Sequence, residues 1–311
     1  MLDTQAKALL DLMVARGVPP THTLSPAEAR AFYRDRRTLT QPDPPAVAEV
    51  RELSATGAAG PIGLRLYRPE TAPRPSPTLV FFHGGGWVIG DLDTHDVVCR
   101  SLALQANCAV VAVDYRMGPE HRFPAAVDDC IAATEWLHAQ ASTLALDPQK
   151  FAVGGDSAGG NLAAVVALAL RDADSTVRLK HQLLIYPATD MRMGTQSHSI
   201  NGQGYMLTRD SIIYFRGHYI DDPAHYADWR SSPLLHPNLA GLPPALVITA
   251  GFDPLRDEGL QYADALSAAG VATQYLCFER QIHGFITMGR VLAEADTAIA
   301  VCANALRRSF G

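Results

Sequence analysis

The sequence predicts an α/β protein whose central sheet is mostly parallel and carries helices on both faces. Three observations predict this class. From residue 78 onward, short apolar runs alternate with longer segments of helical periodicity, as in parallel sheets covered by helices. The chain has 311 residues, enough to bury a sizeable core. Hydrophobic residues make up 48% and charged residues 19% of it, which is typical of a globular protein rather than a disordered one.

The first forty residues are predicted to form helices. The apolar residues that recur there at helical spacing are Leu2, Ala6, Leu9, Leu10 and Met13. A second helix is predicted to begin after Ser25, because Ser25 can cap it, Pro26 suits its first position and Glu28 can complete a capping box. The proline-rich residues 42–45 then end the helical pattern.

The core elements are predicted to follow in alternation. Alternating apolar and polar residues predict half-buried strands at 47–53 and 63–67, and the continuously apolar run at 78–82 suits a fully buried strand. The later strands are predicted at residues 109–113, 151–153, 183–186, 245–249 and 273–278. The helices between and after them are predicted at residues 125–139, 158–171, 258–269 and 291–307.

The segment from Asp190 to about Trp229 does not fit this rhythm and is rich in Gly, His, Tyr and Met. A long insertion in such a fold is often a functional lid, and the alternative is a tolerated surface excursion. The aromatic side chains of the segment favour the first interpretation, because they indicate that the segment packs on another part of the molecule.

Charge and cysteine spacing exclude several classes of protein. The net charge is −6 and no basic run occurs, so we expect neither nucleic acid nor a membrane surface as partner. The five cysteines are widely spaced and contain no CxxC pair, which argues against a zinc knuckle or redox motif and favours buried, inert thiols. The N-terminus lacks the pattern of a secretory signal, so we expect a cytoplasmic protein.

Ser157 is the candidate nucleophile. It stands at the centre of Gly155-Asp156-Ser157-Ala158-Gly159, a G-x-S-x-G motif between a predicted strand and a predicted helix, which is the context of a nucleophile elbow. The glycines leave room for a strained turn, and the helix N-terminus favours developing negative charge. The alternative is a glycine-rich loop with a capping serine, and the strand–helix context favours the nucleophile.

A second glycine motif, His83-Gly84-Gly85-Gly86-Trp87, follows the predicted strand at 78–82. Loops of this HGGG type form oxyanion holes in lipases and esterases, because glycine lets backbone N–H groups approach the substrate oxygen closely. A phosphate-binding loop is the alternative. It is disfavoured because neither G-x-G-x-x-G nor a P-loop lysine follows.

His283 is the candidate general base and Asp253 the candidate acid. Hydrolases of this type carry their triad in the order Ser, acid, His, and His283 follows the last predicted strand. Asp253 lies closest to the carboxyl end of the strand at 245–249, where ligand-facing loops lie. Asp257 and Glu258 are the alternatives, but both fall in a first helical turn, where acids commonly interact with the helix dipole. Asp253 before a proline could also be a helix cap.

Together these motifs resemble the hormone-sensitive-lipase-like esterases of the α/β-hydrolase superfamily, the bacterial branch in particular. The matching stretches are residues 83–87, 114–116, 119–125, 155–160, 186–187, 253–258 and 283–285. The resemblance implies the α/β-hydrolase fold, Asp253 as triad acid, and the backbone N–H groups of Gly85, Gly86 and Ala158 as oxyanion donors. Met117-Gly118 departs from the family's usual Leu-Ala in a structural turn, which should leave the chemistry unchanged.

The resemblance also implies a helical cap built from the N-terminal helices and the insertion. We therefore divide the chain into cap helices at 1–45, a first core part at 46–189, a cap insertion at 190–230 and a second core part at 231–311. The expected function is hydrolysis of short- to medium-chain acyl esters through Ser157, His283 and Asp253 and an acyl-enzyme. The alternatives are an amidase or peptidase of the same fold, or a non-catalytic ligand receptor.

We expect no metal and no cofactor. The expected partner is a small-molecule ester, and the chain could form a homodimer.

Overall fold

The computed structural model describes residues 1–311 and contains one eight-stranded sheet in the order β1-β2-β4-β3-β5-β6-β7-β8. Strands β3 to β8 run parallel to one another, while β2 pairs antiparallel with both β1 and β4. The strands are β1 (Glu49–Gly57), β2 (Gly60–Arg68), β3 (Ser76–Phe82), β4 (Ala109–Asp114), β5 (Leu146–Asp156), β6 (Leu179–Ile185), β7 (Ala245–Phe252) and β8 (Thr273–Ile282). The predicted α/β class and mostly parallel sheet are confirmed.

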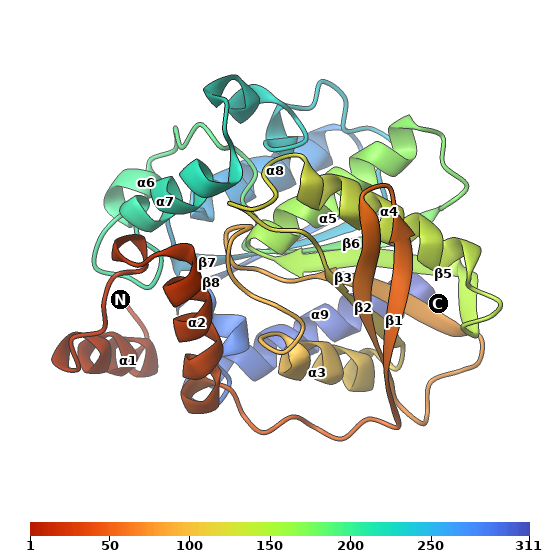
Figure 1. Ribbon diagram of the computed structural model, residues 1–311, viewed down its shortest axis with the longest axis horizontal. Helices are drawn as coiled ribbons and strands as arrows, with labels where there is room; N and C mark the ends of the chain where they lie inside the picture. The colour runs from red at the N-terminus through yellow and green to blue at the C-terminus, as the bar shows by residue number, and fades with distance from the viewer.

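Helices cover both faces of this sheet (Figure 1). The helices are α1 (Thr4–Ala15), α2 (Pro26–Thr40), α3 (Asp96–Ala106), α4 (Ala125–Ala139), α5 (Ala158–Asp172), α6 (Ser197–Ile200), α7 (Arg209–Tyr219), α8 (Arg256–Ala268) and α9 (Glu294–Phe310). The short 3₁₀ helices are η1 (Thr21–Thr23), η2 (Pro223–Ala227), η3 (Pro233–Leu235) and η4 (Phe285–Thr287). No helix is long and apolar enough to span a membrane.

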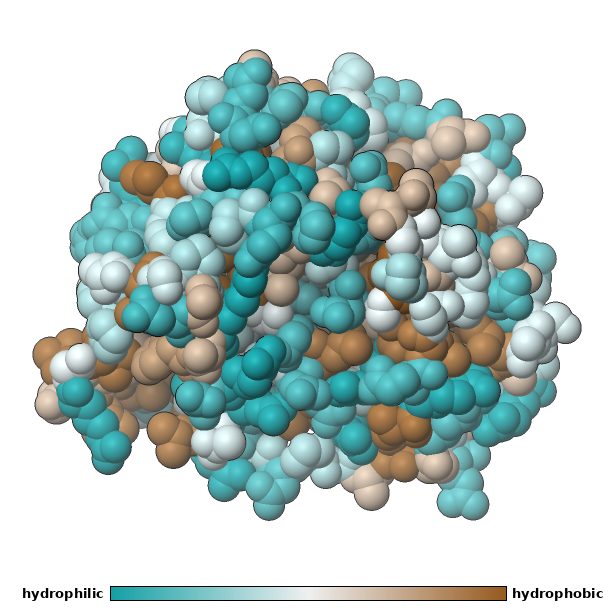
Figure 2. Space-filling model, in the orientation of Figure 1, coloured by the Kyte–Doolittle hydropathy of each residue, from teal (hydrophilic) through white to brown (hydrophobic).

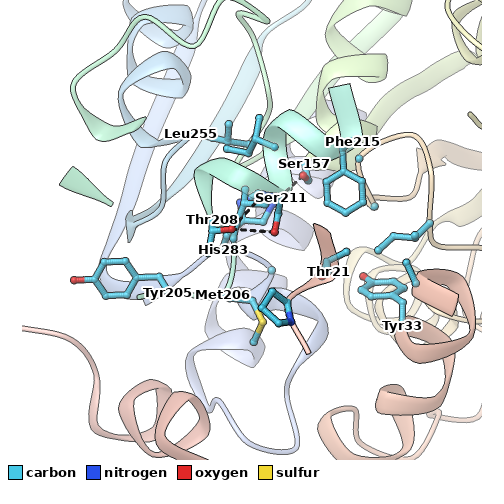
Figure 3. A pocket seen from close by; sticks show the side chains of 18 of the residues that line it. Thr21, Tyr33, Ser157, Tyr205, Met206, Thr208, Ser211, Phe215, Leu255 and His283 are labelled. Atoms are coloured by element: carbon cyan, nitrogen blue, oxygen red, sulfur yellow. Dashed lines mark hydrogen bonds between the residues drawn. The ribbon is translucent and has the colours of Figure 1, made fainter. Parts of the chain in front are cut away.

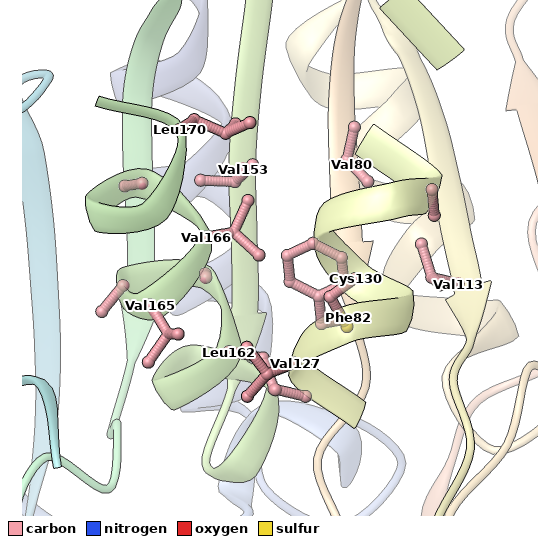
Figure 4. Close-up of a cluster of buried hydrophobic side chains, with 14 of the residues drawn as sticks. Val80, Phe82, Val113, Val127, Cys130, Val153, Leu162, Val165, Val166 and Leu170 are labelled. Atoms are coloured by element: carbon pink, nitrogen blue, oxygen red, sulfur yellow. The ribbon is translucent and has the colours of Figure 1, made fainter. Parts of the chain in front are cut away.

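The buried strand β3 shows how the core is divided between the two faces. Its side chains alternate, so that Val80 and Phe82 join the cluster under α4, α5 and α8, while Leu79 and Phe81 join the cluster under α3 and α9. Figure 4 shows the first cluster, with side chains of α4 and α5 packed onto the strands. Fully burying one aliphatic or aromatic side chain of this kind stabilises the fold by about 1.5–3 kcal/mol.

Both predicted N-terminal helices are present, and the second begins where its capping signal predicts. Ser25 Oγ accepts a hydrogen bond from the N–H of Glu28, and the Glu28 carboxylate accepts one from the N–H of Ser25, which completes the predicted capping box at the start of α2. Asp3 caps α1, because its carboxylate accepts hydrogen bonds from the N–H groups of Gln5 and Ala6. In Figure 1 these two helices lie on the same side of the molecule as α6 and α7, and η1 contacts α7.

The structure adds elements that the sequence pattern does not reveal. Helix α3 is absent from the predicted elements, and the N-cap residue before it, His95, makes no side-chain capping bond, so a start signal is lacking. The insertion contains two helices, α6 and α7. Four of the cysteines are buried as expected, and Cys277 is half-buried.

Candidate active site

Ser157 occupies a sharp turn between β5 and α5. Its backbone has φ 56° and ψ −116°, a region that residues with a side chain rarely adopt. A Cβ added at Gly155 or at Gly159 would collide with the carbonyl oxygen of Phe82, so only glycine fits on either side of the turn. The turn therefore holds Ser157 in the strained conformation expected of a nucleophile elbow.

The three predicted triad residues form a continuous hydrogen-bonded row. The Oγ of Ser157 lies 2.8 Å from Nε2 of His283, and Nδ1 of His283 lies 2.6 Å from Oδ2 of Asp253. Asp253 follows β7 and is fully buried, and His283 follows β8 and is nearly so. A carboxylate at Nδ1 fixes the ring nitrogen that faces Ser157 as a proton acceptor.

The second oxygen of Asp253 is also held, because Oδ1 accepts a hydrogen bond of 2.8 Å from the N–H of Leu255. The alternative acids lie elsewhere. Asp257 accepts a hydrogen bond from the N–H of Ser197, and Glu258 pairs with His198. Neither of them bonds to the imidazole of His283.

The glycine loop after β3 presents backbone donors to the same place. Gly85 and Gly86 have φ values of 129° and 60°, which favour glycine. A Cβ at Gly86 would collide with the ring of Phe215. Neither N–H group donates a hydrogen bond within the protein, and both residues line the cavity that also contains Ser157. Ala158 begins α5 directly after Ser157, where N–H groups lack intrahelical acceptors.

A buried polar network lies behind the glycine loop. Oδ1 of Asp156 accepts a hydrogen bond of 2.8 Å from the N–H of Gly84, and Nε2 of His95 lies 3.1 Å from the same oxygen. Burial alone would raise the pKa of Asp156, but His95 and the N–H of Gly84 outweigh it and hold that pKa below its ordinary value. The carboxylate therefore stays ionised and ties the elbow to the glycine loop.

His83 supports the loop from its other side. Its ring stacks on Tyr115 at a centroid distance of 4.4 Å, and its Nδ1 lies 2.9 Å from the carbonyl oxygen of Gly84. Burial lowers the pKa of His83 to about 4, so the ring is neutral at pH 7. These contacts hold the glycine loop in place.

The cavity above Ser157 has a volume of about 400 Å³. Its walls come from the α1–α2 region, the glycine loop and the insertion (Figure 3). Tyr33, Met206 and Phe215 are among the side chains that surround it. In Figure 2 hydrophobic residues gather on the surface over α1, next to the cavity wall, and Leu12 and Val14 of this helix are exposed. The chain contains no group of three or more His, Cys, Asp or Glu side chains placed to hold a metal ion.

A family model described as the alpha/beta hydrolase fold matches residues 79–287, which include the elbow, the glycine loop and all three triad candidates. The chain belongs to this family. The resemblance to hormone-sensitive-lipase-like esterases, which the sequence motifs indicate, is confirmed.

Relatives of the hydrolase are named for ester hydrolysis. It is 46% identical over 79% of its length to the carboxylic ester hydrolase LipN of Mycobacterium tuberculosis, of which 67% is covered. It is 37% identical to an ethyl acetate hydrolase of Pseudomonas putida, with 94% of this chain and 92% of the relative covered. The ester hydrolase EH1AB1 from the metagenome of Lake Arreo, solved with a derivative of bipyridine phosphonate, superimposes with a TM-score of 0.97 at 43% identity, covering 100% of both chains. The hydrolase is a carboxylesterase.

Two contacts of the site escape sequence reasoning. His95 carries no motif that links it to Asp156, because the two residues meet only in the folded chain. Glu258 is in the first turn of α8, as predicted, but it is 1% exposed and pairs with His198 at 2.7 Å. It therefore does more than interact with the helix dipole.

Proposed function

We propose that Ser157, His283 and Asp253 are the catalytic triad of this carboxylesterase. The N–H groups of Gly85, Gly86 and Ala158 are its oxyanion hole. The observation that carries the proposal is the unbroken row of hydrogen bonds from Ser157 through His283 to Asp253. The two N–H groups of the glycine loop without a protein acceptor support the second part.

In the proposed reaction, Nε2 of His283 takes the proton of Ser157 as Oγ attacks the ester carbonyl carbon. The carbonyl π electrons move to the oxygen, which the oxyanion donors stabilise. The tetrahedral intermediate then collapses, the C–O bond to the alcohol breaks, and His283 returns the proton to the leaving oxygen. Water repeats the same two steps on the acyl-enzyme and releases the acid.

The substrates we propose are esters of short to medium acyl chains. A cavity of about 400 Å³ that the ring of Phe215 narrows beside Gly86 supports this range. Each added methylene contributes about 0.8 kcal/mol of burial while it still fits, and overpacking a closed slot costs more than that burial returns. Catalytic efficiency should therefore rise with chain length and then fall.

We also propose that no activation occurs at an oil–water interface, since the N-terminal wall is fixed to the core. Arg30 of α2 pairs with Glu120 at 2.6 Å and donates to the carbonyl oxygen of Gly118, and Gln41 donates to the carbonyl oxygen of Thr94. A wall that is held in this way does not open as a long mobile flap. We keep the proposed division into a cap, formed by residues 1–45 and 190–230, and a core, and the cavity that both cap segments line together with Ser157 supports it.

The test is a series of p-nitrophenyl esters from acetate to palmitate, measured below and above micelle formation, with Ser157→Ala as the blank. We expect an optimum at short to medium chains and no jump in rate on emulsification. A monotonic rise to palmitate would contradict the proposed substrate range. The same acyl group offered as an ester and as an anilide separates an esterase from an amidase. The cytoplasmic location and a homodimer remain predictions, which cell fractionation and analytical ultracentrifugation test.

A further inference from the structure

The loop that carries Asp253 is bound to the insertion by a cluster of buried side chains on α6. The nearest of them is Asn201, directly after α6. Its Nδ2 donates hydrogen bonds of 3.1 Å to the carbonyl oxygens of both Gly251 and Asp253. Asn201 is 5% exposed. The same two oxygens also accept hydrogen bonds from Arg256, that of Gly251 at 3.3 Å from Nη1 and that of Asp253 at 3.2 Å from the N–H, so Asn201 is the donor that ties them to the insertion.

Ser197, at the start of α6, holds the next part of the loop. Its Oγ donates to the carbonyl oxygen of Pro254 at 2.6 Å, and its N–H donates to Oδ2 of Asp257 at 2.8 Å. The N–H of Asp257 in turn donates to Ser197 Oγ at 3.2 Å. Ser197 is fully buried and its bond to Pro254 lies away from solvent, whereas Asp257, its partner in the other two bonds, is partly exposed.

The third contact is the buried pair of His198 and Glu258, which binds α6 to the first turn of α8, where the loop ends. Nε2 of His198 lies 2.7 Å from Oε2 of Glu258. The other oxygen, Oε1, accepts hydrogen bonds from the N–H groups of Thr189 and Asp190, at 2.7 and 3.3 Å. Glu258 therefore connects α8, α6 and the junction between the core and the insertion.

These contacts reach five of the eight residues from Gly251 to Glu258, and Asp253 is one of the five. A single neutral hydrogen bond stabilises a protein by only about 0.5–1.5 kcal/mol. Several such hydrogen bonds can affect the reaction rate more than they affect stability, because they fix the position of a reacting group. A shift of about 1 Å in a supporting residue can slow a reaction on the order of a hundredfold.

We propose that Asn201 and Ser197 are positioning residues for the triad acid, and that the start of the insertion is part of the catalytic framework rather than of a moving lid. Asn201 sets the backbone of Asp253, and Ser197 sets Pro254 and Asp257. The carboxylate of Asp253 is thereby held against Nδ1 of His283. This inference rests on the proposed role of Asp253.

The test compares Asn201→Ala with wild type and with Gln203→Ala, using p-nitrophenyl acetate over a range of pH. Gln203 is the matched control, because it is an exposed amide of the same segment and bonds only to Asp210. For Asn201→Ala we expect kcat to fall on the order of ten- to a hundredfold, with KM within about twofold of wild type, since no substrate contact is removed.

The pH profile separates positioning from general loss of structure. A poorly held Asp253 stabilises the imidazolium of His283 less, so the acid limb of kcat should move to lower pH in Asn201→Ala. A variant that is merely less folded would lose amplitude without moving this limb. Gln203→Ala should match wild type in both kcat and pH profile.

Asn201→Asp and Ser197→Ala extend the test. The aspartate has the same shape as asparagine but turns an acceptor toward two carbonyl oxygens, so its kcat should fall further than that of the alanine variant. Ser197→Ala should shift kcat and the acid limb in the same direction as Asn201→Ala, and it carries the test if Asn201 variants do not fold. Wild-type kcat and an unmoved limb in folded Asn201→Ala or Ser197→Ala would overturn the proposal.

Asp253→Asn, measured alongside, keeps the two proposals apart. An active Asp253→Asn would refute the triad assignment itself. An inactive Asp253→Asn beside a fully active Asn201→Ala would refute only the positioning role.

Discussion

Asp156 and Gly84 are joined by a buried hydrogen bond of 2.8 Å from the glycine N–H to Oδ1 of the aspartate. The bond links the residue before Ser157 to the residue before Gly85. It therefore sets the distance between the proposed nucleophile and the proposed oxyanion donors of the glycine loop, which lie about seventy residues apart in the chain but must act on one carbonyl group.

Asp156→Ala should lower kcat more than it raises KM. Removing one oxyanion donor outright costs about 10²–10³ in kcat, and we expect a displaced loop to cost up to about a hundredfold. The control is Tyr186→Phe, which removes the weaker bond of 3.4 Å to the other oxygen of Asp156 and should leave kcat nearly unchanged. Equal losses in the two variants would show that the Gly84 bond is not what matters.

Asp253→Asn should be severely impaired and Asp257→Asn only mildly. Asp253 bonds to Nδ1 of His283, whereas Asp257 bonds to Ser197. An amide in place of the carboxylate favours the wrong imidazole tautomer, at a cost of about ten-thousandfold in the serine-protease case. Steady-state kinetics on one ester rank the two variants. The reverse order would move the acid role to Asp257.

Much of this arrangement can be predicted from the sequence, because its parts follow local rules. The apolar runs predict β3 and β5, and the motifs around Ser157 and Gly85 indicate the two turns at their ends. The capping box at Ser25 predicts the start of α2. Each of these signals is contained within a few consecutive residues.

The remaining parts depend on contacts between distant residues. Asn201 and Asp253 meet only because α6 packs on the loop after β7, and nothing in the spacing of the two residues indicates it. Glu258 has the sequence context of a helix-dipole partner, and only its burial against His198 shows its other role. Helix α3 lacks a capping side chain at its start.

The free energy of unfolding should fall as the pH is lowered from about 6.5 to about 4. Burial lowers the pKa of His83 and of His181 to about 4, whereas an unfolded histidine titrates near 6.5. Between these values the unfolded chain binds protons that the folded chain does not, so acid favours unfolding. Each ring should contribute about 2 kcal/mol to the loss between about pH 7 and about pH 5.

Urea unfolding of wild type and His181→Gln at these two pH values measures this contribution. Only one of the two rings is removed and it lies outside the active site, so the variant should lose less stability on acidification than wild type does. The same pH dependence in both proteins would mean that His181 is not held neutral in the folded state.

Phe215→Ala should move the optimum of the ester series to longer acyl chains. The ring lies against Gly86 and lines the cavity, and its removal lengthens the slot. Each further methylene that fits should gain about fourfold in efficiency, the equivalent of about 0.8 kcal/mol. The matched control is Ile213→Ala on the exposed face of the same helix. An optimum that stays in place in Phe215→Ala would exclude this ring as the end of the acyl slot.

The central claim, that Ser157 is the nucleophile, is tested most directly by mass spectrometry of the protein after treatment with a fluorophosphonate. The reagent phosphonylates a serine only where a base activates it. We predict one adduct per chain, located on Ser157, with loss of esterase activity in proportion to labelling and no adduct in Ser157→Ala. An adduct on a different residue, or full labelling of Ser157 without loss of activity, would contradict the account.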